Sequence, residues 1–303
     1  MTVAVAVRGG AAWVDAQYNN RALVPEATDL MAGWTRDSAR ARETLDGAQD
    51  LCFDAASGMC LDVFAPARRR RAGAPVLLFI HGGYWRALDK ADHSFIAPPF
   101  VQAGAVVVVP NYTLCPAIGV DGIALQMAQA VAWTWRQVHR WGGDRTRIVV
   151  AGHSAGGHLA AMLLCCDWPV LSPDLPPGLL RQALSISGLF DLAPLRRVSW
   201  LQPDLRLTPA LVRRLSPVRF PAPSGELVCV AGGAESQEFR RQNRLLHRRW
   251  GTATVPVCEA LDGLNHFSIL RTLTQPGQRL HALALRQLGL PDRQGDGRSR
   301  GAR

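Results

Sequence analysis

The sequence predicts an α/β fold, in which a mostly parallel central sheet is covered by helices on both faces. Short apolar or β-branched runs alternate along the chain with longer stretches of helical spacing, and this alternation is typical of such sheets. The run at 59–64 alternates polar and apolar side chains, which favours an edge strand, whereas the run at 76–80 is continuously apolar and favours a buried one. The other runs expected as strands are 105–109, 148–151, 183–187, 227–230 and 254–258.

Three stretches have the spacing or composition of helices. Residues 120–140 repeat apolar side chains at helical intervals, and the glycine pair that follows them ends a helix. Residues 154–166 are rich in small side chains, so we expect this helix to pack closely on the sheet. A final helix is expected over 276–288, because proline suits the first turn of a helix.

The chain is expected to form one domain over residues 1–290. Its 303 residues, 48% of them hydrophobic, are enough to bury one large core. Residues 189–223 are rich in proline, arginine and leucine and have little strand character, so we expect them to form a small cap insertion over the site. Residues 291–303 are polar and glycine-rich, which predicts a disordered tail.

The net charge of +10 comes almost entirely from arginine, with Lys90 as the single lysine. The densest basic run, residues 68–71, falls between two strand-like segments and is expected as a solvated hairpin turn. Neither this run nor the basic tail has the interleaved aromatic residues that stack on bases. We therefore expect a small-molecule substrate and no nucleic-acid partner.

Membrane association and metal binding are also not expected. No apolar run is long enough to span a bilayer, and the first residues lack a basic segment followed by an apolar stretch, so we expect a cytoplasmic protein. Seven irregularly spaced cysteines fit reduced thiols, and none has zinc-ligand spacing. We expect no metal and no other cofactor; a homodimer stays open.

Residues 152–156 read Gly-His-Ser-Ala-Gly and follow directly on the expected strand at 148–151. A serine between two glycines, at a sharp strand-to-helix turn, is typical of a nucleophile held in strained backbone. We therefore predict that Ser154 is a nucleophile. The alternative is a helix-capping serine beside packing glycines.

Residues 81–85 read His-Gly-Gly-Tyr-Trp and follow the buried strand at 76–80. Glycines at this position let backbone N–H groups approach a substrate oxygen. The N–H groups of Gly82, Gly83 and Ala155 are the expected oxyanion donors, the alternative being a plain glycine turn. Together the two motifs predict the α/β-hydrolase fold and a serine hydrolase.

A serine nucleophile needs a histidine base and a carboxylate that orients it. In this fold the chain order is serine, acid, histidine. His158 lies on the helix of the nucleophile, His247 in an exposed-looking arginine-rich stretch, and His281 inside the final helix. His266 follows the last expected strand and is the predicted base. The order excludes the histidines before the serine, which are His81, His93, His139 and His153.

Glu235 is the predicted acid, because it lies on the loop that leaves the strand at 227–230. Three other carboxylates stay open as substitutes. Asp191 follows an earlier strand, Asp262 lies close to His266 in the sequence, and Glu238 begins the next helix. A carboxylate at the start of a helix can also be stabilised by the helix dipole alone.

With these residues in place, the chain resembles the metal-independent kynurenine formamidases, or arylformamidases. The likeness rests on residues 81–85, on 152–158 and on His266-Phe267, and it covers nearly the whole chain. Residues 233–242 are similar to the family's acid segment, where aspartate is common, so Glu235 is a departure. Residues 15–21 are similar to the N-terminal segment of bacterial members.

The resemblance implies hydrolysis of N-formyl-L-kynurenine to L-kynurenine and formate, in tryptophan degradation. It implies an aromatic pocket that Tyr84, Trp85 and Trp200 could line, the alternative for each being packing within the fold. It also implies a carboxylate site to which Arg196 or Arg197 could contribute. A fold and a set of catalytic residues do not fix the substrate. A carboxylesterase that acts on small aryl esters, and a non-catalytic ligand-binding protein, are the alternatives.

Overall fold

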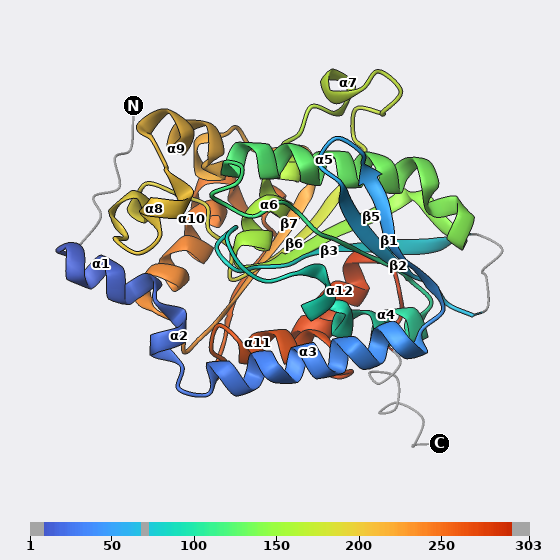
Figure 1. Cartoon of the computed structure of the whole chain (residues 1–303), viewed down its shortest axis with the longest axis horizontal. Helices are drawn as coiled ribbons and strands as arrows, with labels where there is room; N and C mark the ends of the chain where they lie inside the picture. Colours follow the sequence, from blue (N-terminus) through green and yellow to red (C-terminus); the bar gives the residue numbers. More distant parts are fainter. Residues whose placement is uncertain (1–8, 68–72, 293–303) are drawn as a thin grey trace, which may run out of the picture.

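A computed structural model describes residues 9–67 and 73–292 (Figure 1). Its core is one eight-stranded sheet in the order β1-β2-β4-β3-β5-β6-β7-β8. The pairs β1–β2 and β2–β4 are antiparallel and the other pairs are parallel. The strands are β1 (Gly47–Asp54), β2 (Met59–Phe64), β3 (Ala74–Ile80), β4 (Val106–Pro110), β5 (Gly143–His153), β6 (Gln182–Ile186), β7 (Glu226–Gly232) and β8 (Val257–Leu261).

Helices cover both faces of the sheet, as the sequence predicts (Figure 1). Neighbouring residues of the central strands point to opposite faces, so Leu78 packs in one core layer and Leu77 in the other. The layer that contains Leu78 includes side chains of α5 (Val120–Gln137), α6 (Ala155–Leu164) and α10 (Gln237–Thr254). The other layer includes side chains of α3 (Ala27–Thr44), α4 (Ala97–Ala103), α11 (Ser268–Leu273) and α12 (Arg279–Gln287).

Two short helices, α1 (Ala11–Tyr18) and α2 (Asn20–Leu23), precede α3. The region expected as a cap contains only short helices, which lie beside α1 and α10 at one end of the molecule (Figure 1). These are the 3₁₀ turns η4 (Pro194–Arg197) and η5 (Pro217–Arg219) and the helices α8 (Gln202–Leu205) and α9 (Pro209–Leu215). The remaining short elements are η1 (Lys90–Asp92), η2 (Ser94–Ile96), η3 (Val138–Trp141) and α7 (Trp168–Leu171).

Three sequence predictions of elements are wrong. The edge strand is β1, not the run at 59–64, because β1 is rich in polar residues and has no apolar run that marks a strand. The last strand begins at Val257, since α10 continues to Thr254. The final helix begins at Arg279 rather than at 276. The expected turn at 68–71 and nearly all of the tail at 291–303 lie outside the described residues.

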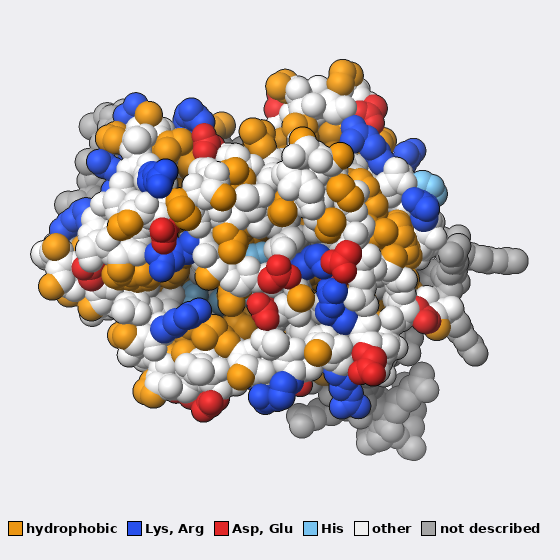
Figure 2. All heavy atoms as spheres, viewed as in Figure 1, with side chains coloured by type: hydrophobic (Ala, Val, Ile, Leu, Met, Phe, Trp, Pro, Cys, Tyr) orange, Lys and Arg blue, Asp and Glu red, His pale blue; other side chains and the backbone are white. Residues whose placement is uncertain are grey.

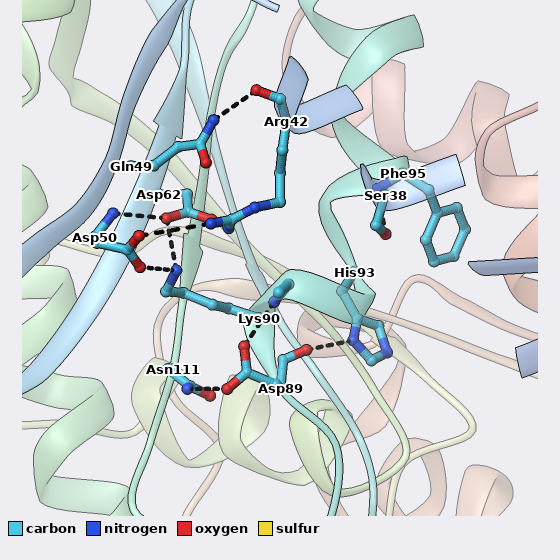
Figure 3. A network of polar contacts seen from close by, with 11 residues as sticks. Ser38, Arg42, Gln49, Asp50, Asp62, Asp89, Lys90, His93, Phe95 and Asn111 are labelled. Atoms are coloured by element: carbon cyan, nitrogen blue, oxygen red, sulfur yellow. Dashed lines mark hydrogen bonds and ion pairs between the residues drawn. The ribbon is translucent and has the colours of Figure 1, made fainter. Parts of the chain in front are cut away.

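A charge cluster around the buried Asp62 attaches α3 and η1 to the antiparallel edge of the sheet (Figure 3). We define it as Arg42, Asp50, Asp62 and Lys90. Asp62 is fully buried on β2 and accepts hydrogen bonds from Lys90 Nζ at 2.7 Å and from the Asp50 amide at 2.9 Å. Arg42 pairs with the second oxygen of Asp62, and Lys90 Nζ also contacts Asp50 Oδ1 at 2.6 Å. Every charge in the cluster therefore has an opposite partner.

Candidate active site

Ser154 lies at the sharp turn between β5 and α6. Its backbone has φ 56° and ψ −115°, a strained conformation for a residue with a side chain. A Cβ atom at Gly152 would lie 2.2 Å from the carbonyl oxygen of Gly156, and one at Gly156 would lie 2.0 Å from that of Ile80. Only glycine fits on either side, so the turn has the geometry that the sequence predicts for a nucleophile.

Glu235 and His266 meet at the carboxyl ends of β7 and β8. His266 Nδ1 lies 2.7 Å from Glu235 Oε2, and both side chains are buried. The other carboxylate oxygen accepts hydrogen bonds from Gly232 N at 2.6 Å and from Ser187 Oγ at 2.5 Å. The carboxylate is thus fixed from three sides and holds the proton of His266 on Nδ1, which leaves Nε2 as the basic nitrogen.

The three substitute carboxylates have other surroundings. Asp191 Oδ1 accepts from the amide of Ala193 at 3.1 Å. Glu238 accepts from the Tyr18 hydroxyl at 2.9 Å and pairs with Arg241 on its own helix. Asp262 is exposed. Of the four candidate carboxylates, Glu235 is therefore the one that the structure places in contact with His266.

His153, which precedes the serine, supports the loop of His266. Its Nε2 lies 2.8 Å from the backbone oxygen of His266, and the two rings are 4.6 Å apart. Burial lowers the pKa of His153 well below its ordinary value, and the nearby His266 and His93 add to this shift. A neutral ring can donate from Nε2 to that oxygen, so His153 positions the loop.

Sequence reasoning did not find Ser187, which donates a hydrogen bond to the Glu235 carboxylate. Ser187 directly follows β6 with φ 54°, and its amide donates to the backbone oxygen of Val230 on the neighbouring strand at 2.7 Å. The feature that could have identified Ser187 is its position at the carboxyl end of the strand next to β7. That neighbourhood depends on strand order, which the sequence pattern does not give.

The glycine loop after β3 lies against the serine turn. A Cβ atom at Gly82 would be 2.9 Å from the carbonyl oxygen of His153 and 3.1 Å from Ser154 Cβ. The Tyr112 hydroxyl donates to the oxygen of Gly82 at 2.9 Å and so fixes this peptide. At Gly83, with φ 97°, a Cβ atom would lie 2.1 Å from the oxygen of Ala87. The loop therefore needs Gly82 to approach Ser154 closely and Gly83 to close its own turn.

Tyr84 and Trp85 follow this loop with positive φ angles of 50° and 57°, and their side chains point to different parts of the molecule. Tyr84 lines the pocket beside Ser154, and its ring is edge-on to Trp200 with centroids 5.5 Å apart. Trp85 is fully buried and packs edge-on against His158 at 5.0 Å. The expectation that Trp85 lines the pocket is therefore wrong, because the left-handed backbone turns it into the core.

The pocket beside Ser154 has a volume of about 260 Å³. In Figure 2 this side of the molecule shows a hollow with histidine and hydrophobic side chains inside it and basic side chains at its rim. The described lining includes two arginines and no acidic side chain. The residues are Asn19, Asn20, Arg21, Met31, Trp34, Gly83, Tyr84, Arg86, Ala87, Leu88, His153, Ser154, Trp200, His266 and Phe267.

The cap arginines expected at a carboxylate site lie elsewhere. Arg196 Nε donates to the backbone oxygen of Leu207 at 3.2 Å, and Arg197 donates to that of Gly9 at 2.7 Å. Neither lines the pocket, whereas Arg21 and Arg86 do. The sequence prediction of Arg196 or Arg197 is wrong because η4 turns both side chains to neighbouring backbone.

Across residues 9–67 and 73–292, no group of three His, Cys, Asp or Glu side chains is arranged to hold a metal ion. In the same part of the chain, no helix combines the length and apolar composition of a membrane span.

Comparison with solved structures defines the class of protein. A protein from Silicibacter sp. TM1040, described as a candidate thioesterase, is 29% identical, with a TM-score of 0.78 over 89% of this chain and 97% of that one. An esterase from Pyrobaculum calidifontis has a TM-score of 0.65 over 89% of this chain and 94% of its own at 17% identity, which shows the fold alone. The chain is an α/β-hydrolase.

Comparison with characterised sequences gives the family. Residues 61–167 match the family described as BD-FAE. The kynurenine formamidase of Danio rerio is 32% identical over 257 residues, which are 82% of this chain and 85% of that protein. The esterase LipC of Mycobacterium tuberculosis is 32% identical over 132 residues, which are 43% of this chain and 33% of LipC. The chain belongs to the kynurenine formamidase family, and the resemblance found in the sequence is confirmed.

Proposed function

We propose that this hydrolase cleaves the formamide bond of N-formyl-L-kynurenine, releasing L-kynurenine and formate. The observation that carries the proposal is the 2.7 Å contact between Glu235 and His266, at a pocket where Ser154 occupies a strained turn. The similarity to the kynurenine formamidase of Danio rerio supports the choice of substrate.

In the proposed mechanism, Ser154 Oγ attacks the formyl carbon while His266 Nε2 takes its proton. The N–H groups of Gly82, Gly83 and Ala155 stabilise the negative charge that develops on the formyl oxygen. His266 then gives the proton to the departing arylamine, and the C–N bond breaks. A water molecule, deprotonated by the same histidine, attacks the formyl-serine and releases formate.

Glu235 orients His266 and stabilises its protonated form in both half-reactions. The hydrogen bonds from Gly232 and Ser187 fix this carboxylate in place. Tyr84, Trp34 and Trp200 provide aromatic surfaces around the pocket, which suit the aniline ring of the substrate.

Hydrolysis of small aryl esters by the same residues is the second candidate. It is favoured by the similarity to LipC over 132 residues of this chain, and the same attack on an ester carbonyl is chemically easier than on an amide.

The test is kcat/KM of the purified protein on N-formyl-L-kynurenine and on a series of 4-nitrophenyl esters, with the Ser154→Ala variant as control. Both assays are repeated after dialysis against EDTA, which is expected to leave the rates unchanged. A formamide rate well above the ester rates is expected. Ester hydrolysis without formamide hydrolysis would contradict the proposed substrate, and loss of activity in EDTA would contradict the mechanism.

A further inference from the structure

Residues 19–21, part of the N-terminal segment that resembles bacterial family members, have no role in the mechanism above. Asn19 joins α1 to α2, Asn20 and Arg21 begin α2, and all three residues line the pocket that contains Ser154. Tyr18, just before them, is fully buried: its backbone oxygen accepts from the Tyr84 hydroxyl at 2.7 Å, and its own hydroxyl donates to Glu238 at 2.9 Å. The segment is therefore held in place at the pocket.

Arg21 gives the pocket an uncompensated positive charge. Of the two arginines in the described lining, Arg86 pairs with Asp204 and donates to the backbone oxygen of Trp200 at 2.8 Å. Arg21 is exposed and makes no hydrogen bond or ion pair with the described residues. Because the described lining has no acidic side chain, the pocket favours an anion.

Asn20, beside Arg21, is a buried donor without an acceptor. Its side chain is only 6% exposed, and its Nδ2 has no hydrogen-bond partner in the part of the chain that the structure describes. Two other residues of the lining, Trp34 and Trp200, each have a buried Nε1 that likewise has no partner there. A buried polar group without a partner costs free energy, so the wall of the pocket is built for a ligand rich in acceptors.

We propose that Asn20 and Arg21 form a subsite for a carboxylate on the substrate, and so select aryl formamides or esters that carry a carboxylate over those that do not. The proposal rests on the proposed function in taking Ser154 as the reacting group. In N-formyl-L-kynurenine the group bound there is the amino-acid carboxylate, which accepts charge-assisted hydrogen bonds from the guanidinium and from the Asn20 amide.

The test uses two substrate pairs, in each of which one member carries an α-amino-acid group with this carboxylate and the other lacks that group. N-formyl-L-kynurenine is compared with 2′-formamidoacetophenone, and O-acetyl-L-tyrosine with 4-methylphenyl acetate. In Arg21→Gln, kcat/KM is expected to fall at least about tenfold on the carboxylate member of a pair and less than about twofold on the neutral member. Arg21→Lys is expected to keep part of the preference for the carboxylate member of each pair. Added salt is expected to reduce this preference in the unmodified protein.

Two further variants make the test specific. Asn20→Asp keeps the shape of the side chain but adds a negative charge. Its kcat/KM is therefore expected to fall on the carboxylate substrates and to stay unchanged on the neutral ones. Arg40→Gln removes another exposed arginine, on α3 and outside the pocket lining. It is expected to leave kcat/KM unchanged on both members of each pair.

An equal effect of Arg21→Gln on both members of each pair, or no effect on either, would overturn the subsite. This outcome is distinct from failure of the proposed function. If the unmodified protein cleaves only the esters, N-formyl-L-kynurenine is the wrong substrate, and the ester pair still decides whether Arg21 selects a carboxylate.

Discussion

Two clusters around a buried carboxylate lie near opposite edges of the sheet, and they differ in whether a basic nitrogen stays accessible to a pocket. The charge cluster at β2 surrounds Asp62 with Lys90 and Arg42, and each charge is neutralised by another (Figure 3). At β7 and β8, Glu235 is equally buried, but its partner His266 lines a pocket together with Ser154. A buried carboxylate with a nitrogen partner is common to both clusters. Access of a basic nitrogen to a pocket distinguishes the candidate active site.

The largest expected effect comes from removing the nucleophile. Ser154→Ala should lower kcat by about 10⁶-fold, because the attacking oxygen is lost while the fold is kept. Steady-state kinetics on the better of the two substrate types measure the effect, and circular dichroism checks the fold. Residual activity within about tenfold of the unmodified protein would show that Ser154 does not react.

The next effect tests which carboxylate orients the histidine. Glu235→Gln should lower kcat by about 10⁴-fold, because an amide cannot stabilise the protonated His266 or hold its tautomer. Asp191→Asn is the matched control, since Asp191 is buried to the same 6% exposure but bonds to Ala193. A larger loss in Asp191→Asn than in Glu235→Gln would mean that the acid is misassigned.

At the charge cluster the expected effect is on stability and not on catalysis. Lys90→Met removes one partner of the fully buried Asp62 and should lower the free energy of unfolding by about 3–5 kcal/mol, with kcat little changed. Asp50→Asn is the comparison, because the Asp50 side chain is 66% exposed and should cost under about 1 kcal/mol. Urea denaturation measures both. Equal losses would contradict the distinction between buried and exposed partners.

The last expected effect is the contribution of a buried histidine to acid sensitivity, which appears only as the pH is lowered. Burial lowers the pKa of His158 from 6.5 to about 4. Between these two pH values the unfolded chain binds a proton that the folded chain does not, so stability falls as pH falls, by about 1.4 kcal/mol for each pH unit. Above pH 6.5 this stability is fully present.

His158→Gln should therefore make the loss of stability between pH 6.5 and 4 less steep, measured by urea denaturation at several pH values. Glutamine keeps a donor for the backbone oxygen of Leu215, which His158 Nε2 contacts at 2.7 Å. His139→Gln, at an exposed histidine, is the control and should leave the pH dependence unchanged. An identical slope in His158→Gln would show that His158 does not couple protonation to folding.

The parts of the site that the sequence predicts are those determined by local geometry. Ser154 is recognisable because its flanking glycines are required by contacts within one strand-to-helix turn. Glu235 and His266 are recognisable because each follows a strand, and parallel strands bring their carboxyl ends to one edge of the sheet. The same reasoning gave a mostly parallel sheet with helices on both faces.

The parts that the sequence does not predict depend on contacts between distant segments. Ser187 reaches Glu235 only because β6 lies beside β7, and Arg21 reaches the pocket only because Tyr18 is anchored to Tyr84. Trp85 was misplaced because two successive positive φ angles reverse the expected direction of its side chain. Strand β1 was missed because its polar residues lack the pattern of a strand.

The most direct measurement is covalent labelling of the protein with a 4-nitrophenyl alkylphosphonate, followed by mass spectrometry of its peptides. An activated serine attacks phosphorus and displaces one equivalent of 4-nitrophenolate, leaving a stable phosphonyl ester. We expect one equivalent released and the label on Ser154, with much slower labelling in Glu235→Gln and none in Ser154→Ala. A label on any other residue, or an undiminished release of 4-nitrophenolate in Ser154→Ala, would contradict the assignment of Ser154 as the nucleophile.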